Sequence, residues 1–257
     1  MQIPKRLTEQ QRKAQLAFAK LLQNPTKADQ IYNDELLDSI GGRIVSTDIS
    51  RFLDKRYRNT PEGRPRDLVP GWDLAWRYAQ DRFKREISNR GSRTLVRFMA
   101  GGWGAGKTHA LKHARLPDLA WDGTLKDTPW ARKIIDLALT NGWRVEVAYV
   151  FRDIELALYG ALERALEEGR SVPIEELPTN HAEVQRSILR LIRRYREEPR
   201  LSFFLFHNLG ARRLRGESLT LQPRDLAPGG PLHYTRRYED YYGEAARQIQ
   251  ALNPASG

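Results

Sequence analysis

The sequence predicts an α/β fold in which a parallel central sheet is flanked by helices on both faces. Three observations support this prediction. Short apolar segments alternate along the chain with longer segments of helical periodicity. One apolar segment, Thr94–Ala100, ends at glycines that are followed by helix-compatible sequence. The 257 residues, 40% of them hydrophobic, are enough for one large α/β domain with a substantial core.

The first part of the chain is predicted to contain two helices and a short strand. A helix capped by Thr8 ends at Asn24-Pro25. Ile44-Val45 predicts a short buried strand that runs into polar residues. After a loop rich in proline and glycine, apolar residues spaced three and four apart predict an amphipathic helix over Trp72–Ser88.

Helices and strands are predicted to alternate in the second half of the chain. Thr128 as N-cap and Pro129 in the first turn begin a helix that ends at Asn141-Gly142. Asp153 can cap the helix that comes after the next strand. The remaining elements expected here are a strand over 143–151, a helix from 181 that stops at Pro199, and a strand over 201–208.

The segment Gly101–Thr108, GGWGAGKT, matches G-x-x-x-x-G-K-[ST] at a predicted junction of strand and helix, and is called the phosphate loop below. Such glycines let backbone N–H groups and the following helix dipole surround a phosphate. Lys107 is expected to reach between the β- and γ-phosphates, and the Thr108 hydroxyl to ligate Mg²⁺. Trp103 can serve as a packing residue or as a cover over bound substrate. The predicted ATP-binding residues are Gly102, Trp103, Gly104, Ala105, Gly106, Lys107 and Thr108.

Composition limits the partners. The net charge of +11, from 43 basic and 32 acidic residues, fits nucleic acid, anionic nucleotides or an acidic protein. The basic residues are dispersed, and no helix-turn-helix, zinc-finger or RNP motif accompanies them, so nucleic acid is the less favoured partner. Cysteine is absent, which excludes disulfides and thiolate metal sites. With no membrane span and no secretory signal, we expect a cytoplasmic protein, or one delivered into a target cell.

Two missing features favour a kinase over a motor or switch. No four-residue apolar strand ends in Asp-Glu, and no Asn-Lys-x-Asp guanine-binding motif occurs. In kinases, an aspartate near the γ-phosphate instead takes a proton from a substrate hydroxyl.

Residues 121–173 resemble the central block of the zeta toxin family of P-loop kinases. In that block a strand ends in an acidic residue followed by Gly-Thr, and a G-[aromatic]-x-V strand, a Glu-Arg pair on a helix and a Gly/Ala-Arg pair before a proline follow. The matching residues are Asp122-Gly123-Thr124, Gly142-Trp143-Arg144-Val145, Glu163-Arg164, and Gly169-Arg170 before Pro173. His181 also has a family counterpart. With the phosphate loop, the resemblance covers roughly residues 94 to 210.

The resemblance implies an ATP-dependent phosphotransferase with the P-loop kinase fold that uses ATP and Mg²⁺. It places arginines that bind ATP at Arg164 and Arg170. Together with Lys107, these two arginines are expected to be catalytic residues. Guanidinium groups suit the charge that spreads over phosphoryl oxygens during transfer. The alternative for Arg164 is a solvated side chain paired with a neighbouring glutamate. The resemblance assigns Asp122 and Thr124 to the substrate cleft, with a simple turn as the alternative.

The general base is expected before the phosphate loop. The family carries its base in a D-x-x-R element after the loop, where this sequence has no room for one. The segment RIVSTDISRFLDKRY instead has an apolar strand, then Asp48, then Arg51 three residues later. Because neighbours in a parallel sheet need not be neighbours in sequence, Asp48 could act as base and Mg²⁺ partner, with Arg51 as substrate anchor. The alternatives are that Asp48 is a helix N-cap and that Asp122 is the base.

Three parts are expected: an N-terminal helical segment (1–40), a zeta-toxin-like kinase domain (41–210) and an irregular C-terminal extension packed on it (211–257). The leading hypothesis is transfer of the ATP γ-phosphoryl group to a hydroxyl of a UDP-N-acetylglucosamine-type sugar nucleotide or of NAD. Such an enzyme would be toxic to a cell and would have an antitoxin or chaperone as protein partner. The alternatives are a nucleic-acid-directed P-loop NTPase or polynucleotide end kinase, and a nucleotide-binding module that has lost catalysis.

Overall fold

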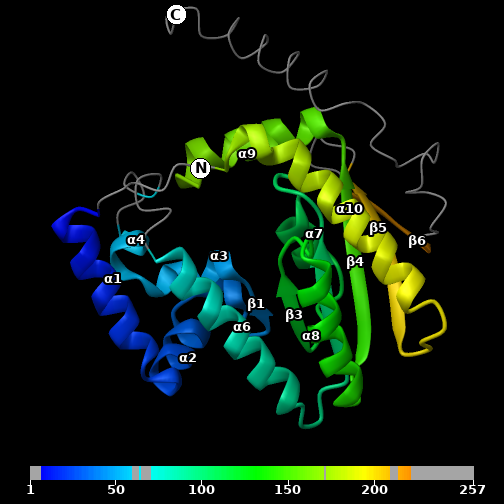
Figure 1. Cartoon of the computed structure of the whole chain (residues 1–257), viewed down its shortest axis with the longest axis horizontal. Helices are drawn as coiled ribbons and strands as arrows, with labels where there is room; N and C mark the ends of the chain where they lie inside the picture. The colour runs from blue at the N-terminus through cyan, green and yellow to red at the C-terminus, as the bar shows by residue number, and fades with distance from the viewer. Residues whose placement is uncertain (1–6, 60–63, 65–70, 171, 209–213, 221–257) are drawn as a thin grey trace, which may run out of the picture.

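The computed structural model describes residues 7–59, 64, 71–170, 172–208 and 214–220. In this part of the chain, a sheet carries helices on both faces, and the N-terminal helices pack beside it (Figure 1). The predicted α/β fold is confirmed. The expected C-terminal extension lies outside the described residues except for a strand at 214–220, and the domain boundaries stay a prediction.

The six strands have the spatial order β1-β3-β2-β4-β5-β6. The first five in that order run parallel, and β6 joins β5 antiparallel at the edge. The four strands whose bounds were predicted are confirmed to within one residue at each end. The strands are β1 (Ile44–Val45), β2 (Leu95–Ala100), β3 (Leu119–Asp122), β4 (Arg144–Arg152), β5 (Leu201–Asn208) and β6 (Leu214–Thr220).

Nine α-helices and three short 3₁₀ turns occur in the described residues. As predicted, Thr8 caps the first helix in a capping box, and Asp153 caps α9. The α-helices are α1 (Glu9–Leu22), α2 (Pro25–Asp34), α3 (Thr47–Ser50), α4 (Lys55–Asn59), α6 (Trp72–Ser88), α7 (Lys107–His113), α8 (Thr128–Thr140), α9 (Ile154–Glu168) and α10 (Leu177–Arg194). The 3₁₀ turns are η1 (Leu37–Ser39), η2 (Arg51–Leu53) and η4 (Ile174–Glu176).

Three helix ends differ from the prediction. The helix expected from 181 begins four residues earlier, at Leu177 of α10. Asp127, not Thr128, is the N-cap of α8, because its carboxylate accepts the Trp130 N–H. The last helix ends before Tyr195 rather than at Pro199, because the chain turns there, with the Glu198 N–H bonded to the Tyr195 carbonyl.

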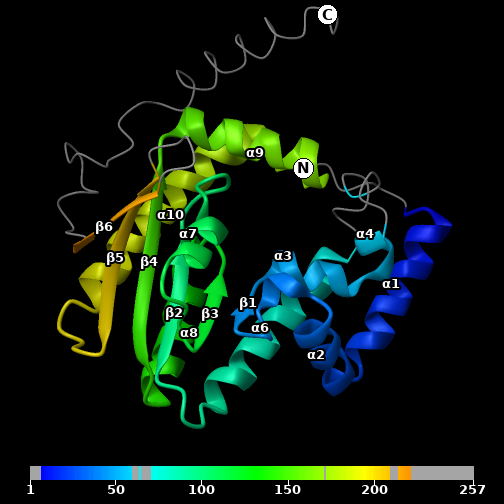
Figure 2. The same cartoon turned by 180° about the vertical axis from the view of Figure 1, so that it is seen from behind.

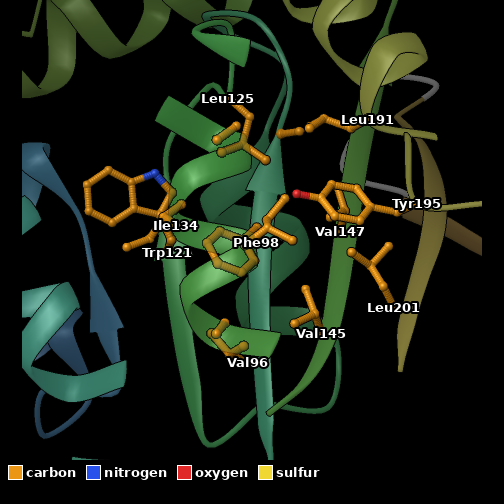
Figure 3. Packing of buried hydrophobic residues seen from close by; sticks show 14 of the residues in the cluster. Val96, Phe98, Trp121, Leu125, Ile134, Val145, Val147, Leu191, Tyr195 and Leu201 are labelled. Atoms are coloured by element: carbon orange, nitrogen blue, oxygen red, sulfur yellow. The ribbon is translucent and has the colours of Figure 1, made fainter. Parts of the chain in front are cut away.

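Alternating side chains divide the core between the two faces of the sheet. Val96 and Phe98 of β2 point to the face covered by α6, α8 and α10 (Figure 3). Met99, between them and the phosphate loop, points to the other face, where it belongs to the cluster that includes Ala110 and Leu111 of α7. Because strands of this sheet are buried on both faces, they read in the sequence as continuous apolar runs.

The two-residue strand β1 is fixed from two sides. It pairs in parallel register with Ala120 and Trp121 of β3. From α2, the Tyr32 hydroxyl donates to the Ile44 carbonyl at 3.0 Å and accepts the Ser46 N–H at 3.1 Å. The residues that follow this early strand therefore emerge at the same end of the sheet as the phosphate loop.

Candidate active site

The phosphate loop connects the carboxyl end of β2 to the first turn of α7. Gly104 and Gly106 have φ angles of 72° and 88°, in the left-handed region that favours glycine. The Lys107 ammonium donates to the Gly102 carbonyl at 2.9 Å across the loop. Burial lowers the pKa of Lys107 to about 8, against the opposing effect of the Asp122 carboxylate.

Two helices pack so closely against the loop that residues larger than glycine would not fit at two of its positions. A Cβ at Gly102 would lie 2.1 Å from the ring of His181 in α10. A Cβ at Gly104 would lie 2.0 Å from the Ala157 carbonyl oxygen in α9. These glycines therefore allow the close approach of α9 and α10, in addition to the phosphate binding that the motif predicts.

Two side chains at the carboxyl ends of neighbouring strands hold the loop, and neither was predicted from the sequence. Arg152, at the end of β4, donates from Nη1 to the Gly104 carbonyl at 2.9 Å. Asn208, at the end of β5, donates from Nδ2 to the Ala105 carbonyl at 3.0 Å. Each follows an apolar run as a polar residue at the carboxyl end of a strand. Because the carboxyl ends of parallel strands meet at one edge of the sheet, this pattern could have indicated both residues.

The backbone of Trp103 is held by two side chains of α10. Its N–H donates to Asn180 Oδ1 at 3.1 Å, and its carbonyl accepts from His181 Nε2 at 2.8 Å. Both residues are 2% exposed. Burial lowers the pKa of His181 to about 4, so the imidazole is neutral at pH 7, with its proton on Nε2. The Trp103 side chain packs in the apolar cluster between α9 and α10.

Asp122, the last residue of β3, lies against the first turn of α7. The Thr108 hydroxyl donates to Asp122 Oδ2 at 2.7 Å. Burial raises the pKa of Asp122, against the opposing effect of Lys107. The Thr124 carbonyl accepts the Gly101 N–H at 3.4 Å, so the chain after β3 also contacts the loop. Hydroxyl and carboxylate oxygens are the ligands that Mg²⁺ prefers, and these two residues fit an ion held at bound phosphates.

Asp48 lies in the first turn of α3, directly after β1, and Ser46 rather than Asp48 caps this helix. Its carboxylate forms an ion pair with Arg170 Nη2, and Arg164 Nη2 lies 3.9 Å from the same oxygen. Burial opposes ionisation of Asp48, but four neighbouring cations, led by Arg170 and including Lys107, together hold its pKa below the usual value. The connection expected from the sequence thus brings Asp48 to the lysine of the phosphate loop.

Arg164 and Arg170 reach Asp48 from α9 and from the segment that follows it. The side chain of Arg164 is 33% exposed and that of Arg170 is 17% exposed. Burial disfavours the charge of Arg170, but the carboxylates of Asp48 and Glu168 outweigh it and raise the pKa. The Glu168 carbonyl accepts from Arg64 at 2.8 Å. The helix α9 therefore links the sheet to the N-terminal half of the chain (Figure 2).

Arg51, the expected substrate anchor, is enclosed by aromatic side chains. It is 1% exposed, and its guanidinium lies 4.3 Å from the ring centroid of Tyr57 and 5.8 Å from that of Trp72. Arg64 lies 5.0 Å from the ring centroid of Phe52 in the same region. Although it is enclosed, Arg51 is one of the cations whose charge lowers the pKa of Asp48.

In the described residues, no cluster of three or more His, Asp or Glu side chains could hold a metal ion by itself. None of the helices in the described residues has the length and apolar character needed to cross a membrane.

The zeta toxin family model matches residues 117–201. The match confirms the inferred resemblance over the segment from β3 to the start of β5, which includes Asp122, Arg164 and Arg170. The phosphate loop and Asp48 lie before the matched segment. A solved chain from the PezAT chromosomal toxin–antitoxin system of Streptococcus pneumoniae is 14% identical, with a TM-score of 0.49, and the alignment covers 98% of this chain and 100% of that one. The search of curated proteins gave no match.

Proposed function

We propose that this chain, with its zeta toxin segment, is an ATP-dependent phosphotransferase that moves the γ-phosphoryl group to a hydroxyl of a small nucleotide-containing acceptor. One observation carries the proposal. The Asp48 carboxylate is held by Arg170 and Arg164 within electrostatic reach of Lys107 in the phosphate loop. A carboxylate, two guanidinium groups and a phosphate-binding lysine are the side chains that transfer from ATP to a hydroxyl requires.

The loop side of the site would bind the nucleotide. Backbone N–H groups from Gly102 to Thr108 and the Lys107 ammonium would hold the phosphates. The Thr108 hydroxyl and the Asp122 carboxylate, 2.7 Å apart, would hold Mg²⁺, which neutralises phosphate charge when bound. Asp48 is the further metal partner suggested by the sequence.

Asp48 would act as general base once Arg170 releases it. In the free protein the ion pair with Arg170 lowers the pKa of Asp48 and makes it a weak base. A γ-phosphate bound by Arg170 and Arg164 would draw both cations away from the carboxylate. The pKa of Asp48 would then rise towards the value that a general base needs.

The transfer step is a displacement at the γ-phosphorus. The acceptor hydroxyl gives its proton to Asp48 while the hydroxyl oxygen forms a bond to the γ-phosphorus. The bond to the β,γ-bridging oxygen breaks, and ADP leaves with that electron pair. Arg164 and Arg170 would stabilise the charge on the phosphoryl oxygens, and Lys107 the charge on the leaving side.

The acceptor would lie on the side of Asp48, towards Thr124, and the enclosed Arg51 would act through its charge on Asp48 rather than by contact. The zeta toxin resemblance favours a UDP-N-acetylglucosamine-type sugar nucleotide or NAD as acceptor. It also favours toxicity to a target cell and an antitoxin or chaperone that covers the cleft. Mass spectrometry of metabolites after brief induction in bacteria, compared between the parent and Asp48→Ala, would identify the phosphorylated acceptor.

The direct test incubates the protein with ATP, Mg²⁺ and each acceptor, and separates the products by mass. We expect a product heavier by one phosphoryl group with one acceptor class. If only ADP and free phosphate form with every acceptor, the transferase proposal fails.

A second candidate, a nucleic-acid-directed kinase or NTPase, has one observation in its favour. Arg186, Arg190 and Arg193 are exposed on α10 at helical spacing, and within the described residues none of them forms an ion pair. Gel shifts with DNA and RNA, and stimulation of ATP turnover by either, would support this candidate. Their absence at physiological salt would leave the small-molecule kinase.

A further inference from the structure

We propose that Asn180 and His181 are positioning residues that hold the phosphate loop in its binding shape before a nucleotide arrives. The inference rests on the proposed function only in that the loop binds a nucleotide. Neither residue needs to touch the reacting atoms, because both act through the backbone of Trp103.

The two contacts fix one peptide segment from both sides. Asn180 Oδ1 accepts a hydrogen bond from the Trp103 N–H at 3.1 Å, while His181 Nε2 donates to the Trp103 carbonyl at 2.8 Å. Both residues lie on α10, a helix of 18 residues that packs on the central sheet. The loop is therefore tied to the rigid core rather than to another loop.

The rest of Trp103 and its neighbour point to the same role. The indole packs with Ile154 and Leu158 of α9 and Leu177 of α10. Gly102 leaves room for the His181 ring, since a Cβ there would lie 2.1 Å from it. Trp103 is the single large side chain among the glycines and alanine of Gly101–Gly106. Such a glycine-rich loop has much conformational freedom to lose on binding, and an anchored loop loses less of it.

The charge state of His181 also suits the loop. A neutral imidazole with its proton on Nε2 can donate to the Trp103 carbonyl without adding a cation beside Lys107. Asn180 Nδ2 is buried without a hydrogen-bond partner among the described residues. A buried unpaired amide donor costs stability, so this asparagine is better explained by its contact with the loop than by the needs of the helix.

The test is calorimetric binding of ADP with Mg²⁺, which requires no acceptor. His181→Leu and Asn180→Leu each remove one contact at similar volume, and we expect each to weaken ADP binding about 10-fold. His181→Gln, whose amide can donate from the same position, should stay within about 3-fold of the parent. Val184→Ala is the matched control, because it removes buried volume from the same helix at a residue of the core cluster on the sheet.

A second measurement reads the loop without any nucleotide. Hydrogen–deuterium exchange of a peptide covering Gly101–Gly106 should be faster in the two leucine variants than in the parent, and unchanged in Val184→Ala. If the leucine variants bind ADP like the parent, or if Val184→Ala weakens binding as much as they do, the inference is wrong. If one leucine variant does not fold, the other and His181→Gln decide. A parent that binds no ADP would instead remove the proposed function, so the two failures are distinguishable.

Discussion

The two sides of the site are held together by different forces. The phosphate loop is held by hydrogen bonds between its backbone and the side chains of Arg152, Asn180, His181 and Asn208. The base side is held by ion pairs around Asp48, whose side chain is 41% exposed. Backbone anchors keep one shape, whereas ion pairs of partly exposed groups are weak and can change partners. Under the proposed function, this difference would give a site that is preformed for the nucleotide and rearranges for the chemistry.

Lys107→Met should give the largest effect. The variant removes the ammonium that would lie between the phosphates, and we expect loss of transfer by about 1000-fold together with weaker ADP binding. Calorimetry and product formation measure the two effects. Lys112→Met, at an exposed lysine of the same helix, is the control. A Lys107 variant that keeps normal ADP affinity and turnover would show that this loop is not the nucleotide site.

Protonation of His181 should make the folded protein less stable at low pH. Its pKa is about 4 in the folded protein, below the ordinary value of 6.5, so the unfolded chain takes up this proton first as the pH falls. The free energy of unfolding should therefore fall between pH 6.5 and 4, by about 3 kcal/mol from this group. Urea unfolding of the parent and of His181→Gln at several pH values isolates the contribution. Parallel curves for the two proteins would contradict a buried neutral histidine.

Arg170→Ala should affect catalysis more than binding. It removes a charge from the phosphoryl group in the transition state, and we expect kcat to fall about 100-fold with little change in ADP affinity. Because Arg170 is the strongest cation lowering the pKa of Asp48, its loss should also move the acid limb of the kcat/KM profile to higher pH. Arg186→Ala is a control at an exposed arginine. An unchanged pH profile would show that Arg170 does not control the pKa of Asp48.

Gly104→Ala should be the smallest effect and tests how tightly α9 packs on the loop. The added Cβ would meet the Ala157 carbonyl at 2.0 Å, which only a backbone shift can relieve. We expect a loss of about 2 kcal/mol in unfolding free energy. Gly41→Ala has a similar positive φ but nothing within 4 Å, so it should cost only about 1 kcal/mol. Equal losses in the two variants would mean that the close contact with α9 has no effect on the free energy of unfolding.

The sequence predicted the elements and the acidic side of the site better than the supports of the loop. Continuous apolar runs that end in glycine or aspartate marked the strands, and Asp48 with Arg51 followed such a run. The contacts of Asn180 and Asn208 could not be predicted, because their partners are backbone atoms of a loop distant in sequence. The enclosure of Arg51 depends on Trp72 in another helix, which no local pattern indicates.

The most direct test of the central claim compares Asp48→Asn with the parent in transfer to a hydroxyl acceptor, with ADP affinity measured in parallel. Asn keeps the shape of the side chain but cannot take the proton, so transfer should fall by about 100-fold or more while ADP binding is retained. Asp38→Asn, at an exposed aspartate, should behave like the parent. Transfer by Asp48→Asn at the rate of the parent would contradict the claim that Asp48 is the base.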